Sequence, residues 1–202
     1  CGCGVQPLRK QRRKGMKMMQ KCTLCPRNCN ANRNVGEKGV CGVEGPGIVG
    51  ARAALHMWEE PCISGENGSG TVFFSGCSLR CIYCQNYEIA HAKRGKRITV
   101  ERLSEIFLEL AGKGANNINL VTPTHYTPEI IQAVSRAKKQ GLNLPIVYNC
   151  SGYEKVETLE MLDGIVDIYL TDFKYMEEEA AAKYSKAPDY PEVAKRALKE
   201  MV

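Results

Sequence analysis

Residues 71–84 read Thr71-Val-Phe-Phe-Ser-Gly-Cys77-Ser-Leu-Arg-Cys81-Ile-Tyr-Cys84, and this stretch decides the fold. Its first four residues are apolar or β-branched, which is typical of a short strand buried on both faces. The loop that follows carries three cysteines spaced C-x3-C-x2-C. The stretch therefore predicts a buried strand whose carboxyl end presents three thiols.

Further strand patterns follow at residues 118–121, 146–148 and 166–170. Helical patterns separate the strands, with Thr99 and Thr127 as expected N-caps and Pro128 in the favoured first position. The apolar stripes consist of Leu103, Ile106, Phe107 and Leu110, then Ile130, Ile131, Val134 and Ala137, then Val156, Leu159 and Leu162, and finally Val193, Ala194, Ala197, Leu198 and Met201. Alternating strands and helices predict an α/β fold with four βα units around a parallel sheet.

In parallel α/β folds, ligands bind at the carboxyl ends of the strands. Polar or reactive residues follow every predicted strand here, so we expect one shared rim. Besides the cysteines, the candidate rim residues are Thr122, Thr124 and His125 after the second strand, Asn149 and Ser151 after the third, and Asp172 and Lys174 after the fourth.

Three thiolates at the spacing of Cys77, Cys81 and Cys84 can hold a 4Fe-4S cluster and leave its fourth iron without a protein ligand. S-adenosylmethionine (SAM) can chelate that iron, and the cofactors then carry the difficult chemistry. The alternative is structural zinc, which normally has four closed ligands and paired C-x2-C knuckles. The spacing favours the cluster.

This motif, with Tyr83 before its last cysteine, resembles the signature of the radical SAM superfamily. The segments Trp58-Glu-Glu-Pro61, Gly68-Ser-Gly-Thr71 and Cys84-Gln-Asn86 are similar to proteins described as pyruvate formate-lyase activating enzymes. The resemblance runs from about Cys22 to Val202. It implies a partial (β/α) barrel of parallel strands, here truncated after about four βα units. It also implies reductive SAM cleavage to a 5'-deoxyadenosyl radical that abstracts hydrogen.

The resemblance assigns expected roles to the rim residues. Tyr83 would face the SAM adenine, and residues 122–125 would replace a Gly-Gly-Glu-like segment that binds the SAM amino group. His125 is either a proton carrier or a packed histidine. Asn149 and Asp172 would lie where the activating enzyme places oxygen ligands for a monovalent cation, and Lys174 would join Asp172 at the rim.

Four more cysteines, Cys22, Cys25, Cys29 and Cys41, form a second group in a glycine-rich stretch. Such a stretch has little apolar core, so bound metal would supply its folding free energy. Zinc, a second iron-sulfur cluster and merely reduced thiols all remain open. We expect a basic, disordered leader at 1–21, a Cys-rich metal-binding module at 22–65 and a radical SAM core at 66–202 that is incomplete at its C-terminus.

The net charge of +6 suggests nucleic acid at first sight, but seven basic residues lie before residue 22 with no acidic residue among them. The remainder is close to neutral, which argues against nucleic-acid binding. No apolar stretch has membrane-spanning length, so we expect a cytoplasmic protein.

The resemblance implies a protein substrate, such as a glycyl radical enzyme, or a small molecule, and a flavodoxin- or ferredoxin-type electron donor. The competing class is a non-catalytic iron-sulfur electron-transfer or metal-scaffold protein.

Overall fold

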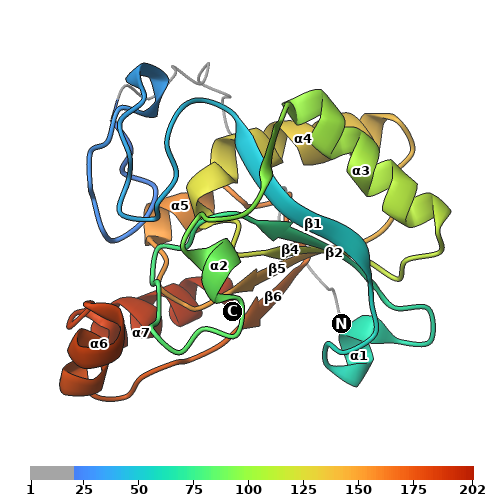
Figure 1. The fold of residues 1–202 in the computed structure, drawn as a ribbon. Helices are drawn as coiled ribbons and strands as arrows, with labels where there is room; N and C mark the ends of the chain where they lie inside the picture. The colour runs from blue at the N-terminus through green and yellow to red at the C-terminus, as the bar shows by residue number, and fades with distance from the viewer. Residues whose placement is uncertain (1–20) are drawn as a thin grey trace, which may run out of the picture.

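The computed structural model describes residues 21–202, and its centre is a six-stranded sheet with the strand order β3-β1-β2-β4-β5-β6 (Figure 1). The expected disordered leader lies outside the described residues except for Lys21. The strands are β1 (Ile48–His56), β2 (Ser69–Phe74), β3 (Lys96–Ile98), β4 (Ile118–Val121), β5 (Ile146–Cys150) and β6 (Ile168–Thr171). The helices are α1 (Pro61–Ser64), α2 (Tyr87–Ala90), α3 (Val100–Gly112), α4 (Thr127–Lys139), α5 (Val156–Glu160), α6 (Glu178–Ser185) and α7 (Tyr190–Met201), with 3-10 turns η1 (Arg33–Val35) and η2 (Thr124–Tyr126).

The four strands expected from the sequence are present and run parallel to one another. Val72 of β2 pairs with Leu120 of β4, Leu120 with Tyr148 of β5, and Tyr148 with Tyr169 of β6. Their carboxyl ends therefore lie at one edge of the sheet, which is the edge where the cysteine loop begins. This arrangement confirms the parallel sheet of an α/β fold that the sequence predicts.

Two antiparallel strands extend the sheet beyond β2. Strand β1 pairs with β2 on one side and with β3 on the other. The sequence did not indicate either strand, because β1 contains Gly50, Arg52 and two adjacent alanines and lacks a regular alternation, and β3 has only three residues. Strand β1 belongs to the 22–65 segment, so that segment contributes directly to the sheet.

Helices α3 and α4 lie side by side over one face of the sheet (Figure 1). Thr99 caps α3 as expected, because its side chain accepts a hydrogen bond from the Arg102 N–H. The capping role expected of Thr127 was wrong. Thr127 is the first residue of α4, Tyr126 occupies the cap position, and the Thr127 hydroxyl donates to the Thr124 carbonyl at 2.8 Å.

Helices α5 and α7 pack together, and α6 packs on α7 (Figure 1). Leu159, Leu162 and Ala197 are buried with Tyr148 and Cys150 of β5. These contacts close the sheet on the side of β5 and β6. Within residues 21–202, no helix is both long and apolar enough to cross a membrane.

Candidate functional site

Cys77, Cys81 and Cys84 lie on the loop that leaves the carboxyl end of β2. The side chains of Cys77 and Cys81 are buried, and that of Cys84 is half-buried. Arg80 turns the loop between the first two cysteines with a φ of 53°, a left-handed conformation that costs a non-glycine residue energy. This left-handed turn lies between Cys77 and Cys81.

Main-chain N–H groups point at the sulfurs of this loop. Burial raises the pKa of Cys77 to about 11, and it is opposed by N–H donors of Arg80 and Leu79. Burial also raises the pKa of Cys84, against an N–H donor of Asn86. The charges of Cys81 and Cys84 raise the pKa of Cys77 further, so the three sulfurs lie near one another. N–H donors of this kind stabilise ligated thiolates.

Lys174 and Asp172 follow β6 and approach this loop. Lys174 Nζ lies 2.6 Å from Asp172 Oδ2. Burial alone would lower the pKa of Lys174, but Asp172 and the more distant Cys81 and Tyr83 raise it. The charge of Lys174 in turn partly opposes the rise in the pKa of Cys84. The structure thus brings the end of β6 beside the cysteine loop, as parallel strands predict.

Tyr83 is about half exposed, and its ring meets Tyr175 and Tyr184 edge-on, with ring centroids 6.3 and 6.1 Å away. Tyr175 and Tyr184 come from the segment that contains α6. One side of the Tyr83 ring is therefore supported by protein, while an exposed part of the ring is available for a flat ligand.

Thr122 and Thr124 follow β4. Thr122 has a φ of 53°, unusual for a β-branched residue, and its hydroxyl donates to the Val121 carbonyl at 2.8 Å. Thr124 is buried, and its hydroxyl donates to Glu154 Oε1 at 2.7 Å. Thr122 thus remains at the rim, whereas the Thr124 hydroxyl is already bound inside the protein.

Glu154 is the partner of Thr124 and was not anticipated. It is fully buried, and Tyr148 also donates to it at 3.3 Å. Burial raises the pKa of Glu154 to about 8. Nothing in the local sequence distinguishes this glutamate from exposed Glu157 three residues later, because only the packing of β4, β5 and α5 buries it.

His125 is buried, with Nε2 2.8 Å from the Ser75 carbonyl and Nδ1 without a hydrogen-bond partner among the described residues. Burial lowers the pKa of His125 to about 4. The hydrogen bond to the Ser75 carbonyl opposes this shift, and the charge of Arg33 adds to it. The ring is therefore neutral near pH 7, with the proton on Nε2. This geometry favours the packed-histidine interpretation over the proton carrier.

Asn149 and Ser151 lie at the end of β5, both half-buried. The Asn149 carbonyl accepts from the Thr122 N–H at 3.0 Å, and the Ser151 carbonyl accepts from the Tyr190 hydroxyl at 2.6 Å. Their side chains make no hydrogen bond within residues 21–202. The amide of buried Asn119, which was not anticipated, lies beside the Glu59 carboxyl but makes no hydrogen bond of normal geometry. The half-buried side chains of Asn149 and Ser151 are available to a bound ligand.

The second group of cysteines forms a compact structure of turns. The Cys22 N–H donates to the Ala31 carbonyl, and the Asn28 N–H donates to the Cys25 carbonyl. Cys25 and Cys41 are buried, while Cys22 and Cys29 are half-buried. Burial raises the pKa of Cys25 to about 12, and the charges of Cys41 and Cys22 raise it further. The charges of Cys22 and Cys29 likewise raise the pKa of Cys41, so the four thiols lie near one another.

Neither group of cysteines has the geometry of a site for a single metal ion. Among residues 21–202, no three His, Cys, Asp or Glu side chains lie close enough together to hold a single metal ion. This holds for both groups of cysteines. A tetrahedral zinc site needs all its sulfurs about 2.3 Å from one point.

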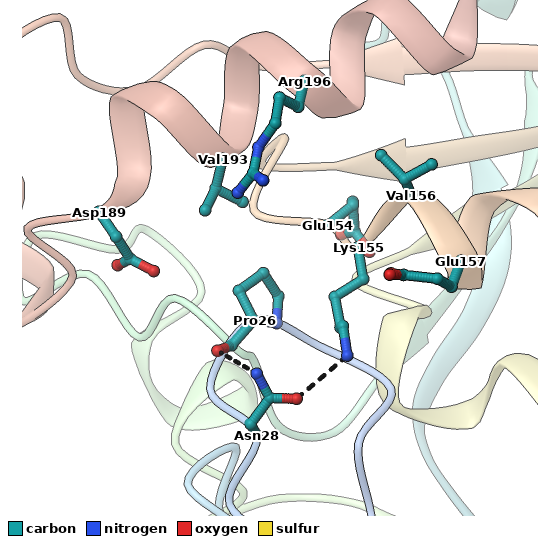
Figure 2. Close-up of a pocket in the computed structure, with 9 residues that line it drawn as sticks. All are labelled: Pro26, Asn28, Glu154, Lys155, Val156, Glu157, Asp189, Val193 and Arg196. Carbon is teal, nitrogen blue, oxygen red and sulfur yellow. Dashed lines mark hydrogen bonds between the residues drawn. The ribbon is translucent and has the colours of Figure 1, made fainter.

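A pocket of about 240 Å³ lies between the turn at Pro26, the start of α5 and helix α7 (Figure 2). Figure 2 shows Lys155 Nζ donating to Asn28 Oδ1, at 3.1 Å, across the pocket mouth. Glu154 and the charged side chains of Glu157, Asp189 and Arg196 complete the lining. None of the expected SAM-binding residues lines this pocket, so it is distinct from the rim.

An uncharacterised protein of Methanocaldococcus jannaschii is 31% identical over 187 residues, covering 89% of this chain and 53% of that protein. Pyruvate formate-lyase 1-activating enzyme of Escherichia coli K12 is 27% identical over 134 residues (62% of this chain, 53% of the enzyme), and pyruvate formate-lyase-activating enzyme of Clostridium pasteurianum is 30% identical over 122 (58% and 50%).

The chain spans about half the length of these curated relatives. No solved structure matched it. Residues 71–202, which contain most of β2, the cysteine loop and the three other parallel strands, match the family model of the radical SAM superfamily. This match covers more than half of the chain, so the chain belongs to the radical SAM superfamily.

Proposed function

We propose that this chain is the SAM-binding part of an enzyme that cleaves SAM reductively and abstracts hydrogen with the resulting radical. The observation that carries the proposal is the loop of Cys77, Cys81 and Cys84 at the carboxyl end of the first parallel strand. Its three thiols, two of which (Cys77 and Cys84) have N–H donors directed at their sulfurs, fit a 4Fe-4S cluster that keeps one iron open. Bound there, the cluster and SAM would supply a 5'-deoxyadenosyl radical.

The surrounding residues would bind and orient the cofactors. Tyr83 offers a supported aromatic ring to the adenine, and Thr122 and Asn149 offer oxygen acceptors to the SAM amino group. Lys174, held by Asp172, places a positive charge beside Cys84 and would stabilise the anionic thiolates. These roles rest on position at the rim.

For the target, we propose the backbone of a glycine in a partner protein. The similarity to pyruvate formate-lyase activating enzymes supports this choice, and glycine suits it because a backbone without a side chain can enter a narrow site. A flavodoxin- or ferredoxin-type protein would donate the electron. A small-molecule substrate is the other outcome of the test. A cytoplasmic location belongs to the same proposal, since iron-sulfur chemistry needs reduced thiols.

Replacing Cys81 by alanine tests the proposal. After anaerobic reconstitution, the wild-type chain should bind SAM, change its electron paramagnetic resonance spectrum on SAM addition, and release 5'-deoxyadenosine when reduced. The Cys81→Ala variant should lose all three properties, because only three thiolates anchor the cluster. Cys62→Ala is the matched control, since Cys62 is exposed and outside both groups. A SAM response retained by Cys81→Ala would contradict the proposal.

A further inference from the structure

Hydrogen bonds connect the second group of cysteines (Cys22, Cys25, Cys29 and Cys41) directly to the loop of the first group (Cys77, Cys81 and Cys84). Arg27, within that group, donates to the Ser78 carbonyl at 2.9 Å and to the Ser185 carbonyl at 2.6 Å. Arg80 of the cysteine loop donates back to the Val40 carbonyl at 2.9 Å. The two groups are far apart in the sequence, yet each supplies an arginine that binds the main chain of the other.

One hydrogen bond directly joins a cysteine of each group. The Cys77 N–H donates to the Cys41 carbonyl at 3.2 Å. Gly76 permits this approach, because a Cβ at that position would lie 2.9 Å from the Cys41 oxygen and 2.6 Å from Val43 Cγ2. Gly76 also has a φ of 92°, which favours glycine. A short path therefore links the Cys41 and Cys77 sulfurs. It runs through the covalent bonds of each cysteine and the one hydrogen bond between them.

Two of the four sulfurs have surroundings like those of the first group. Main-chain N–H groups of Arg27 and Val43 are directed at the sulfurs of Cys25 and Cys41. The sulfurs of Cys41 and Cys29 lie 3.2 and 3.5 Å from the position that a Cβ of Gly39 would take, so Gly39 leaves room between them. Arg33 Nη2 lies 3.9 Å from the Cys22 sulfur and brings a positive charge to the group.

We propose that Cys22, Cys25, Cys29 and Cys41 bind a second iron-sulfur cluster beside the one proposed at Cys77. Four thiols close such a cluster completely, in contrast to the three of the first group. The lack of a site for a single metal ion among the described residues favours a cluster over zinc. Ligands of a cluster bind different iron atoms and stand apart, whereas no three thiols among the described residues converge on one point.

From its location we infer that this second cluster transfers electrons to the first. This role rests on the proposed function of the first cluster. Cys22 and Cys29 reach the surface, while Cys41 contacts Cys77. The second cluster would take one electron from a reduced ferredoxin or flavodoxin and return to its oxidised form as the electron passes inward. That electron is the one consumed in breaking the carbon-sulfur bond of SAM. The second cluster therefore has the same oxidation state before and after each transfer.

Iron content of the full chain, reconstituted anaerobically, is the first test. We expect about eight irons per wild-type chain and about four in Cys29→Ser, four for each cluster. The variant should keep the spectral response to SAM and should keep SAM cleavage with dithionite, which reduces the first cluster directly. Cleavage driven by a reduced ferredoxin should fall at least about tenfold. Cys62→Ser should match the wild type in every measurement.

Two results would overturn the inference. About four irons and one zinc per wild-type chain would mean that the second group of cysteines binds structural zinc. About four irons with no other metal would mean that this group binds no metal. Because iron counts are taken on the wild-type chain, a variant that fails to fold leaves this test intact. Loss of the SAM response in Cys81→Ala with second-cluster iron retained would separate the two sites. Absence of a SAM response in the wild type would instead contradict the proposed function.

Discussion

Replacing Glu154 by glutamine should remove a pH dependence from the stability of this fold. Glu154 is fully buried, and burial raises its pKa from 4.5 to about 8 against the hydrogen bonds from Thr124 and Tyr148. The folded chain therefore keeps the Glu154 proton at neutral pH, while the unfolded chain releases it. Rising pH then favours unfolding.

The magnitude follows from the two pKa values. The contribution of Glu154 to the free energy of unfolding is fully present below about pH 4.5 and is lost as the pH rises to about 8. At pH 7 the loss amounts to about 3.5 kcal/mol, from about 1.4 kcal/mol for each pH unit between the unfolded pKa of 4.5 and pH 7. Glutamine imitates the protonated carboxyl, so Glu154→Gln should be the more stable protein at pH 7 by up to this amount.

Urea unfolding at several pH values between 4.5 and 8 measures the effect. The wild type should lose stability relative to Glu154→Gln as the pH rises, and the two curves should meet near pH 4.5. Glu157→Gln is the matched control, because Glu157 is exposed on the same segment and should leave the wild-type pH dependence unchanged. Parallel curves for the wild type and Glu154→Gln would refute the reasoning, since they would mean that the folded state does not hold this proton.

Two further predictions concern the contact between the cysteine groups. Gly76→Ala should destabilise the chain by about 2 kcal/mol or more in urea unfolding, because its Cβ would meet Val43 and the Cys41 carbonyl in a left-handed conformation. Gly112→Ala, with open space around its Cβ, should not; equal effects would contradict the close approach at Gly76. Arg27→Lys should lower the free energy of unfolding by about 2 kcal/mol, since one ammonium cannot replace a guanidinium that binds Ser78 and Ser185 together. An unchanged unfolding midpoint would show that Arg27 does not hold the two segments together.

Much of the architecture could be predicted because it depends on local patterns. The strand at 71–74 and helix α3 with its Thr99 cap each follow from neighbouring residues, whose apolar spacing and hydrogen-bonding groups act within a turn or two. The C-x3-C-x2-C motif is equally local. Short βα connections then make the strands parallel and bring their ends together, which is why the rim itself could be expected.

The sequence by itself determined the parallel units and the thiols of Cys77, Cys81 and Cys84 at their rim. Only the tertiary structure decided that β1 joins the sheet, that His125 is neutral and enclosed, and that Glu154 is buried against Thr124. Each of these depends on a partner distant in the sequence, whose approach sets the burial and the hydrogen bonds. The bond from the Cys77 N–H to the Cys41 carbonyl is of the same kind, because no local pattern can encode the meeting of two loops 36 residues apart.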